Sequence, residues 1–275
     1  SLFFLVYSTI TLFYSINIDL SLFGEYERKE TYFITVIYIF LFLIAANHYK
    51  FSNWHLILFS VSISLICIYA IFQLYGIELI ELTFLAKYKI SQSWHYMAFS
   101  TMGNPNFLAS LLAMTLPLFV FAFIKSGNYF WTIPMSLNYF VLLATRTRGG
   151  WIGAFAGFAI LIAIMAVRKF SFKNILICCG IHVILTIIYA FLFSGFFERL
   201  WSAFDTMATV VASENQEELL NSGSFRIGIW KGVWILIEKK PLTGYGIETL
   251  RQAIIKDPEV VSFLRSISPN IVNTD

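Results

Sequence analysis

Residues 104–124 read NPNFLASLLAMTLPLFVFAFI, and the fold of this chain is decided by this stretch and by others like it. It contains no charged residue and is long enough to cross the hydrocarbon core of a bilayer, which takes about 20 mostly apolar residues. Asn104 suits the N-cap of a helix, and Pro105 suits the first helical position, where a missing N–H costs nothing. We therefore predict a transmembrane helix from this point to about Ile124.

The composition of the whole chain extends this interpretation. Of its 275 residues, 58% are hydrophobic and 13% are charged, whereas soluble domains are about 45–50% apolar and about 25% charged. The chain is therefore expected to be an all-α, polytopic integral membrane protein. Its net charge of +3 is scattered, which argues against nucleic acid as a partner. The three cysteines form neither a disulfide framework nor a metal set, and we expect no metal and no cofactor.

Seven apolar stretches predict about seven transmembrane helices, at roughly 2–18, 32–46, 54–75, 104–124, 129–144, 151–167 and 175–196. Pro134 is expected to kink the fifth. We expect two parts, a transmembrane bundle over 1–197 and a polar loop over 198–275. Because apolar sequence begins at Ser1 and the chain stops at Asp275 within a polar segment, we interpret it as a fragment of a longer protein.

The loops between these stretches predict the orientation. Those after the second, fourth and sixth helices are short and carry basic residues without acidic ones, which is typical of the cytoplasmic side. These basic residues are Lys50, Lys125, Arg168, Lys169 and Lys173. The loop over 198–275, together with Arg146 and Arg148, is then extracytoplasmic, and we expect a multi-pass protein of the cytoplasmic (inner) membrane.

The polar loop contains a stretch that predicts an amphipathic helix, SGSFRIGIWKGVWILIEKKPLTGYG at 222–246. Ser222 or Ser224 can cap its start, and Pro241 ends it near Lys239. One face carries an apolar stripe made of Phe225, Ile229, Val233 and Leu236. A pair of glycines, Gly228 and Gly232, permits close packing against a neighbour.

Arg226 lies in the first turn of this helix, beside backbone N–H groups that have no helical acceptor. Such a position suits a phosphate or a diphosphate. The alternative is that Arg226 lies over Trp230, one turn further on, by a cation–π contact.

A second arginine stretch, TRTRGGW, occupies 145–151 between two apolar stretches. Charge at a membrane boundary is costly unless it faces water, a partner or an anion. Arg146 has the alternative of reaching lipid headgroups, whereas Arg148 is followed by glycines that let another backbone or a ligand approach closely. If the predicted topology holds, Arg148 and Arg226 share one face of the membrane, where two guanidinium groups suit a lipid-linked diphosphate.

Further candidates for the substrate site lie on the same predicted face. They are His95, Tyr245, Arg251 and Arg265. His182, within an apolar stretch, is expected to be a hydrogen-bonded core histidine instead. The sequence has no HExxH, no Walker loop and no GxSxG motif.

Three motifs together resemble the O-antigen ligase/polymerase family of membrane glycosyltransferases. They are Gly103-Asn104-Pro105-Asn106, then Thr147-Arg148-Gly149-Gly150, and finally Arg226 to Trp230 with Pro241-Leu242-Thr243-Gly244-Tyr245-Gly246. The resemblance implies transfer of a glycan from a polyprenyl-diphosphate carrier, such as undecaprenyl diphosphate, to an acceptor glycan, lipid or protein. It implies inversion without a metal, in the biosynthesis of a surface polysaccharide. By position, Arg148 and Arg226 match the arginines of the family that hold the diphosphate.

The resemblance also implies a histidine, in a His-Asn motif late in the large loop, that activates the acceptor hydroxyl. That motif does not occur up to Asp275, and we expect it beyond this point. Two other functions stay open: a transporter or flippase for an anionic lipid or a small solute, and a non-catalytic membrane subunit. Because the centres of the apolar stretches are almost free of charge, surface chemistry is favoured over a translocation path.

Overall fold

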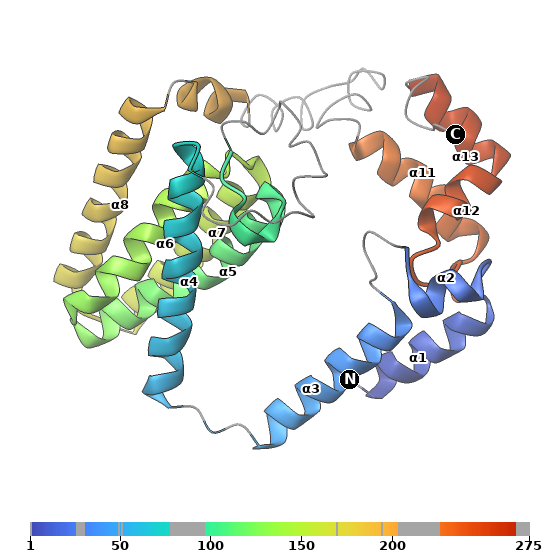
Figure 1. Ribbon diagram of the computed structural model, residues 1–275, viewed down its shortest axis with the longest axis horizontal. Coiled ribbons are helices and arrows are strands. Elements are labelled where there is room, and N and C mark those ends of the chain that lie inside the picture. Colours follow the sequence, from blue (N-terminus) through green and yellow to red (C-terminus); the bar gives the residue numbers. More distant parts are fainter. Residues whose placement is uncertain are drawn as a thin grey trace. The chain divides into compact units, whose positions relative to one another are not determined.

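The computed structural model describes residues 2–25, 31–48, 50, 52–77, 97–168, 170–193, 195–202 and 226–267, except for the side chains of Ala166 and Arg226. All regular secondary structure in these ranges is helical, which confirms the all-α prediction (Figure 1). The chain divides into two compact units. One comprises residues 51–203, and the other combines residues 1–50 with 204–275.

In the described part of residues 51–203, five helices of more than ten residues form a bundle. They are α4 (Asn53–Leu74), α5 (Pro105–Ser126), α6 (Thr132–Ala144), α7 (Arg148–Val167) and α8 (Phe172–Leu192). Helix α5 packs against α6, α7 and α8, while α4 packs against α6 (Figure 1). In its most apolar 18-residue stretch, 56% of α5 is buried, against 11% in α7 and 22% in α8. Helix α5 is therefore the core of the bundle, and α7 and α8 leave most of their apolar surface for lipid.

Local signals fix both ends of α5. Asn104 caps its start, where Oδ1 accepts a hydrogen bond from the backbone N–H of Asn106 at 2.8 Å, and Pro105 is its first residue. Gly127 ends it in the left-handed conformation, with φ 65°, and donates its N–H to the carbonyl of Phe123. These observations confirm the predicted start of this helix and extend its end to Ser126.

Polar side chains inside the bundle bond to one another or to backbone. The Nδ2 of buried Asn138 in α6 donates to the Oγ1 of Thr115 in α5 at 2.7 Å. His182 is buried in α8, where its Nδ1 lies 2.7 Å from the carbonyl oxygen of Cys178 and its ring stands edge-on to Tyr139. The prediction that His182 is a hydrogen-bonded core residue is confirmed.

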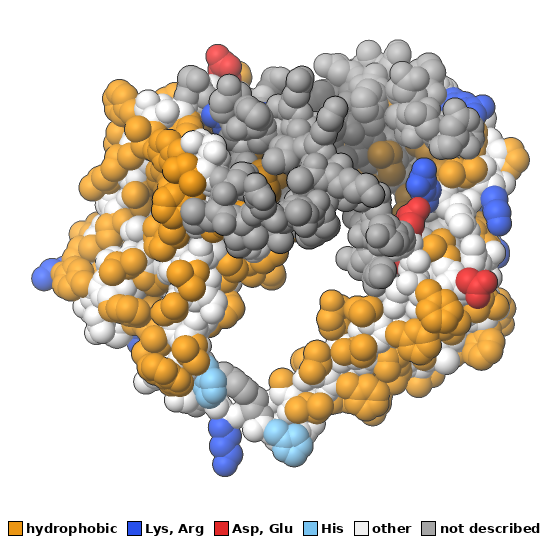
Figure 2. All heavy atoms as spheres, in the orientation of Figure 1, with side chains coloured by type: hydrophobic (Ala, Val, Ile, Leu, Met, Phe, Trp, Pro, Cys, Tyr) orange, Lys and Arg blue, Asp and Glu red, His pale blue; other side chains and the backbone are white. Residues whose placement is uncertain are grey.

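Four helices in the described part of the chain are long and apolar enough to cross a membrane: α4, α5, α7 and α8. Three shorter apolar helices occupy the other predicted stretches: α1 (Leu2–Phe13), α3 (Tyr32–His48) and α6, which follows the 3-10 turn η3 (Tyr129–Trp131). Seven apolar helices thus form where they were expected, and the count of seven membrane crossings stays a prediction. Large apolar side chains cover much of the described surface, as expected for lipid contact (Figure 2).

Three details of the predicted helices change. The first helix was expected to reach residue 18, but α1 ends at Phe13, and a separate helix α2 (Ile18–Phe23) begins after Asn17. The Oδ1 of Asn17 accepts from the N–H of Leu20 at 3.0 Å and caps this new helix. Pro134 is the third residue of α6, where backbone N–H groups have no helical acceptor, so it breaks no hydrogen bond. Helix α7 begins at Arg148 and not at Trp151.

The other unit contains three short helices after the polar segment: α11 (Arg226–Lys239), α12 (Leu250–Lys256) and α13 (Pro258–Ile267). Leu236 of α11 is buried with Val260 and Leu264 of α13. A Cβ on Gly232 would lie 3.3 Å from side-chain carbons of the same two α13 residues, so this glycine permits close contact. The predicted end of the amphipathic helix and the packing role of Gly232 are confirmed, while its predicted cap and Phe225 lie outside the described residues.

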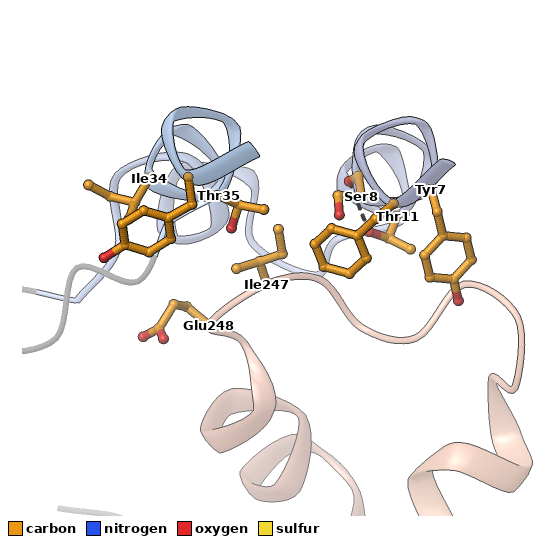
Figure 3. A pocket seen from close by; sticks show the side chains of 9 residues that line it. Tyr7, Ser8, Thr11, Ile34, Thr35, Ile247 and Glu248 are labelled. Carbon is orange, nitrogen blue, oxygen red and sulfur yellow. Dashed lines mark hydrogen bonds between the residues drawn. The ribbon is translucent and has the colours of Figure 1, made fainter. Parts of the chain in front are cut away.

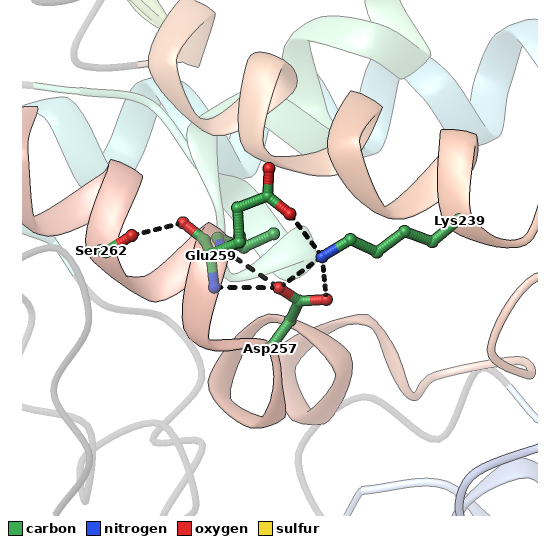
Figure 4. Close-up of polar contacts among 5 residues, drawn as sticks. Lys239, Asp257, Glu259 and Ser262 are labelled. Carbon is green, nitrogen blue, oxygen red and sulfur yellow. Dashed lines mark hydrogen bonds and ion pairs between the residues drawn. The ribbon is translucent and has the colours of Figure 1, made fainter.

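An ion-pair network closes this group of helices (Figure 4). The Nζ of Lys239, the last residue of α11, lies 2.7 Å from Asp257 Oδ2 and 2.7 Å from Glu259 Oε2. The Oδ1 of Asp257 also accepts from the backbone N–H groups of Glu259 and Val260, which caps α13. Hydrogen bonding to Lys239 lowers the pKa of Asp257, and the two carboxylates raise the pKa of Lys239.

The turn after α11, residues 242–248, docks onto the first helices of the same unit. The N–H of Ile16 donates to the carbonyl of Tyr245 at 3.0 Å, and the hydroxyl of Ser21 donates to the carbonyl of Ile247 at 2.8 Å. Gly246 has φ 104°, and a Cβ there would lie 2.6 Å from the Cβ of Ser15. The glycine is therefore required both for its backbone conformation and for the close approach.

Candidate anion-binding site

The stretch 145–148 is a tight turn between α6 and α7. Thr145 is buried, and its Oγ1 donates to the carbonyl of Leu142 at 2.7 Å and lies 2.9 Å from the Oγ1 of Thr147. Arg146 has φ 51°, a left-handed conformation that is uncommon for a residue with a side chain. The turn ends at Arg148, which is the first residue of α7. The two arginines of the motif are thus placed side by side at the amino terminus of a 20-residue helix.

Gly150 brings this turn against α5. A Cβ at Gly150 would lie 2.6 Å from the Cβ of Ala109 and 2.8 Å from the Oγ1 of Thr147, so only glycine fits. At Gly149, in contrast, a Cβ would meet nothing within 4 Å. The close contact places the first turn of α7 beside the beginning of α5. Helix α5 is capped by Asn104 and starts at Pro105. Two motifs that are about 40 residues apart in the sequence therefore form one structure.

A third arginine, Arg199, meets this turn from the short helix formed by residues 196–202, which follows α8. Its Nε donates to the backbone carbonyl of Arg146 at 3.1 Å. Arg148 in turn donates from Nη1 to the carbonyl of Ser202 at 3.3 Å. Arg146 donates from Nε to the hydroxyl of buried Tyr189, in α8, at 3.4 Å. These hydrogen bonds bring three guanidinium groups together at one end of the bundle.

Like charges gather in this three-arginine cluster (Arg146, Arg148 and Arg199), and their effect is seen at Arg199. Burial lowers the pKa of Arg199, and the positive charges of Arg148 and Arg146 lower it further. Arg199 forms no ion pair with any described residue. The amino terminus of α7 adds the positive end of its helix dipole. This arrangement favours a bound anion, and guanidinium groups bind phosphate oxygens in pairs.

The sequence reasoning missed Arg199. It placed the end of the bundle at residue 197 and treated the charges that follow as loop residues. One signal was present, since Glu198 and Arg199 are the first charged residues after the seventh apolar stretch, on the face predicted for Arg148. The contact with Arg146 spans 53 residues and is not a local signal.

The other predicted site residues lie in the unit of residues 1–50 and 204–275, or outside the described residues. Arg226 is the first residue of α11, and its side chain is not described; His95 is outside the described ranges. Arg251 Nη1 lies 3.4 Å from Glu25 Oε1, and Arg265 is exposed near the end of α13.

Two aromatic candidates complete this set. Trp230 is 67% exposed on α11, and the ring of Tyr245 lies 4.8 Å below the Nζ of Lys240. Because the structure does not place the two units relative to each other, the pairing of Arg148 with Arg226 stays a prediction, as do the substrate-binding roles of the residues in this unit.

A pocket of about 550 Å³ lies in the same unit, between α1, α3 and the turn after α11 (Figure 3). Its hydroxyl groups are mostly engaged, since Thr11 donates to the carbonyl of Ser8 and Thr35 to that of Thr31. Glu248, with φ 63°, contributes the one carboxylate of the lining. Over the described residues, no group of three or more His, Cys, Asp or Glu side chains is arranged to hold a metal ion.

Comparison with protein families decides the assignment. Residues 130–266 match the model of a family described as O-antigen ligase, a match that spans α6 to α13 and contains Arg146, Arg148, Arg199 and Arg226. The chain belongs to the O-antigen ligase family. As an O-antigen ligase family member with several apolar helices, it is a multi-pass membrane protein of the glycan ligase or polymerase type. Neither a curated protein nor a solved structure matches the chain.

Proposed function

We propose that this O-antigen ligase family protein transfers a glycan from a polyprenyl-diphosphate carrier to an acceptor hydroxyl. The acceptor is a glycan, a lipid or a protein, and the product is a surface polysaccharide. The observation that carries the proposal is the three-arginine cluster at the amino terminus of α7, within the region that matches the family. A diphosphate is the part of such a donor that needs concentrated positive charge.

The proposed chemistry is a displacement at the anomeric carbon. The acceptor oxygen forms a bond to this carbon while the bond from the carbon to the diphosphate oxygen breaks, with inversion. The electron pair of the broken bond goes to the diphosphate, where negative charge develops. Arg148, together with Arg226, stabilises this leaving group by charge-assisted hydrogen bonds. The proton of the acceptor hydroxyl goes to a base, which we expect to be the histidine of the family's late loop motif.

The proposed reaction uses no metal and no cofactor, because guanidinium groups supply the positive charge that a divalent cation supplies in other glycosyltransferases. A guanidinium stays protonated at every physiological pH. Its donors are fixed in a plane, which matches the geometry of phosphate oxygens. The turn at 145–148 and its bonds to the 196–202 helix hold these donors in place before substrate arrives.

The geometry of α7 supports an active site at one membrane surface. Twenty residues of helix span about 30 Å, the thickness of the hydrocarbon core. Arg148 begins α7, and Arg168 directly follows its last residue, so the two belong at opposite surfaces. With Arg168 in the cytoplasm, as the basic loops predict, the arginine cluster lies on the extracytoplasmic face of the inner membrane. The partners there are the lipid-linked glycan, the acceptor and membrane lipid.

The test is glycan transfer in membranes that contain the parent protein, Arg148→Ala, Arg226→Ala or the control Arg168→Ala. We expect the first two substitutions to lower the rate about 100-fold or more, as for the loss of a donor that stabilises transition-state charge. Protein abundance should stay normal and the donor should accumulate, while Arg168→Ala transfers at the parental rate. Full activity of Arg148→Ala would overturn the proposed role. A parent protein that moves a lipid or solute and transfers no glycan would instead indicate a transporter or flippase.

A further inference from the structure

We propose that Arg199 is a direct ligand of the diphosphate, so that the site at the amino terminus of α7 binds it with three arginines. This inference rests on the proposed function, because it concerns the same anion. Arg199 lies outside the Thr-Arg-Gly-Gly motif, on the helix of residues 196–202, which follows the carboxyl end of α8. From there it donates a hydrogen bond to the backbone of Arg146. Its role is therefore to complete the site from a second part of the chain.

The hydrogen bonding of Arg199 leaves donors for a ligand. A guanidinium group carries five N–H donors in one plane. The Nε–H of Arg199 donates to the carbonyl of Arg146, and its terminal nitrogens make no hydrogen bond to any described residue. The bond through Nε fixes the plane of the group against the turn that carries Arg146 and Arg148. The terminal N–H groups are thus held close to the other two arginines and remain available to phosphate oxygens.

The charges around Arg199 also favour an anionic ligand. Arg199 is half-buried beside two other cations, and a bound anion would stabilise its charge at this position. Burial and the two neighbouring arginines lower the pKa of Arg199, so its charged form would be stabilised by a bound anion. Among the described groups, Tyr189 alone acts in the opposite direction on this pKa. A phosphate would supply Arg199 with the opposite charge that no described residue provides to it in an ion pair.

Arg199 has one alternative role, which is to hold the left-handed turn at Arg146 without touching the anion. The two roles predict different results. A residue that only supports the turn weakens binding indirectly, through the position of Arg148, and is not itself covered by the anion, whereas a ligand is covered by the anion that it binds. The two roles are therefore separated by measuring anion binding together with the protection of Arg199 from chemical modification.

The experiment measures the binding of inorganic pyrophosphate to the purified full chain in detergent, alongside its thermal unfolding. The variants are Arg199→Gln, Arg148→Gln and the matched control Arg168→Gln, at the opposite end of α7. We expect Arg199→Gln and Arg148→Gln each to weaken binding about tenfold or more, as for the loss of a charge-assisted hydrogen bond. Arg168→Gln should bind as the parent does.

The outcomes separate this inference from the proposed function. If Arg148→Gln weakens binding and a folded Arg199→Gln does not, Arg199 is no ligand, and the proposed function stands. If both variants bind pyrophosphate as the parent does, the diphosphate site itself is wrongly placed. If a folded Arg199→Gln binds more weakly while Arg168→Gln does not, and pyrophosphate also protects Arg199 of the parent from chemical modification, the inference holds.

A second measurement on the parent protein needs no variant and so does not depend on the folding of Arg199→Gln. Phenylglyoxal modifies accessible arginines, and mass spectrometry identifies which ones. We expect pyrophosphate to slow the modification of Arg199 and Arg148 severalfold and to leave that of Arg168 unchanged. Equal modification of Arg199 with and without pyrophosphate, while Arg148 is protected, would overturn the inference.

Discussion

Two turns of this protein carry its most distinctive motifs, and they are built for different purposes. The turn at 145–148 lies between α6 and α7, and the turn at 242–248 follows α11. Both contain left-handed residues, Arg146 in the first and Gly244, Gly246 and Glu248 in the second. Both are fixed by hydrogen bonds to distant parts of their own unit. They differ in the charged side chains that they bring together.

The turn at 242–248 carries one charge, on Glu248, and much of its backbone is bonded to the first helices of the unit. Its carbonyls accept hydrogen bonds from Tyr7, Ile16 and Ser21, and the charges at the end of α11 pair in the network of Lys239, Asp257 and Glu259. The turn at 145–148 instead gathers cations, because Arg199 joins Arg146 and Arg148 without an ion pair of its own to any described residue. A matched turn stabilises the fold, whereas a cation held like Arg199, with no ion pair to a described residue, suits the anionic ligand that we propose.

Gly246→Ala is expected to have the largest effect on stability, and it tests how the turn at 242–248 is held. The new Cβ would fall onto the side chain of Ser15, in a backbone conformation with φ 104° that an alanine rarely adopts. We expect the free energy of unfolding to drop by about 2–4 kcal/mol, from strain and overpacking together, which denaturant unfolding in detergent measures. The control is Gly244→Ala, with φ 62° and open space around the Cβ, which should cost only about 1–2 kcal/mol. Equal losses for both variants would show that the contact with Ser15 is unimportant.

Gly150→Ala is expected to have the next largest effect, at the other turn. Its Cβ would lie 2.6 Å from that of Ala109, so α5 and α7 must move apart at a cost of about 1–3 kcal/mol. The double variant Ala109→Gly/Gly150→Ala restores the space and should recover most of the loss, as a double-mutant cycle in unfolding free energy will show. If the double variant is less stable than either single variant, the two helices do not meet at these residues.

The smallest effect concerns the ion pairs at the end of α11. The pKa of Asp257 is lowered in the folded protein, so its contribution to stability is present above its unfolded value of 3.8 and is lost as pH falls through the folded pKa. The pKa of Lys239 is raised, so its contribution is present below 10.5 and is lost as pH rises through the folded value. Asp257→Asn removes the charge and keeps an oxygen for the cap of α13.

We expect Asp257→Asn to lower the unfolding temperature slightly at pH 7 and to flatten its decline in acid. Asp257→Ala also removes the cap and should cost about 1 kcal/mol more. The measurement is thermal unfolding across the pH range. If the unfolding temperature of Asp257→Asn falls in acid as steeply as that of the parent, the pH dependence comes from other groups.

The sequence predicted the fold where local chemistry determines it. Asn104 and Pro105 begin α5 and Pro241 follows the end of α11, because caps and prolines act within one helical turn. The end of α1 was predicted wrongly, since the N–H of Ile16 bonds to the carbonyl of Tyr245, 229 residues further along the chain. Apolar composition continues past this point and gives no sign of the break.

The same distinction applies to the site. Arg146 and Arg148 are neighbours in the sequence, and the glycines beside them indicated a close approach, which Gly150 confirms. Arg199 joins them through the packing of α8 on the bundle, and no motif connects it to them. Whether Arg226 joins the same anion stays a prediction, because it depends on how the second unit meets the first.

The central claim is that the turn at 145–148 serves chemistry and the turn at 242–248 serves stability. The most direct measurement is the rate of glycan transfer per folded molecule for Arg148→Ala and Gly244→Ala, with folded protein counted by size-exclusion chromatography. We predict that Arg148→Ala folds as the parent does and transfers about 100-fold more slowly or worse, whereas the folded fraction of Gly244→Ala transfers at close to the parental rate. A folded Arg148→Ala that transfers as fast as the parent would contradict the account.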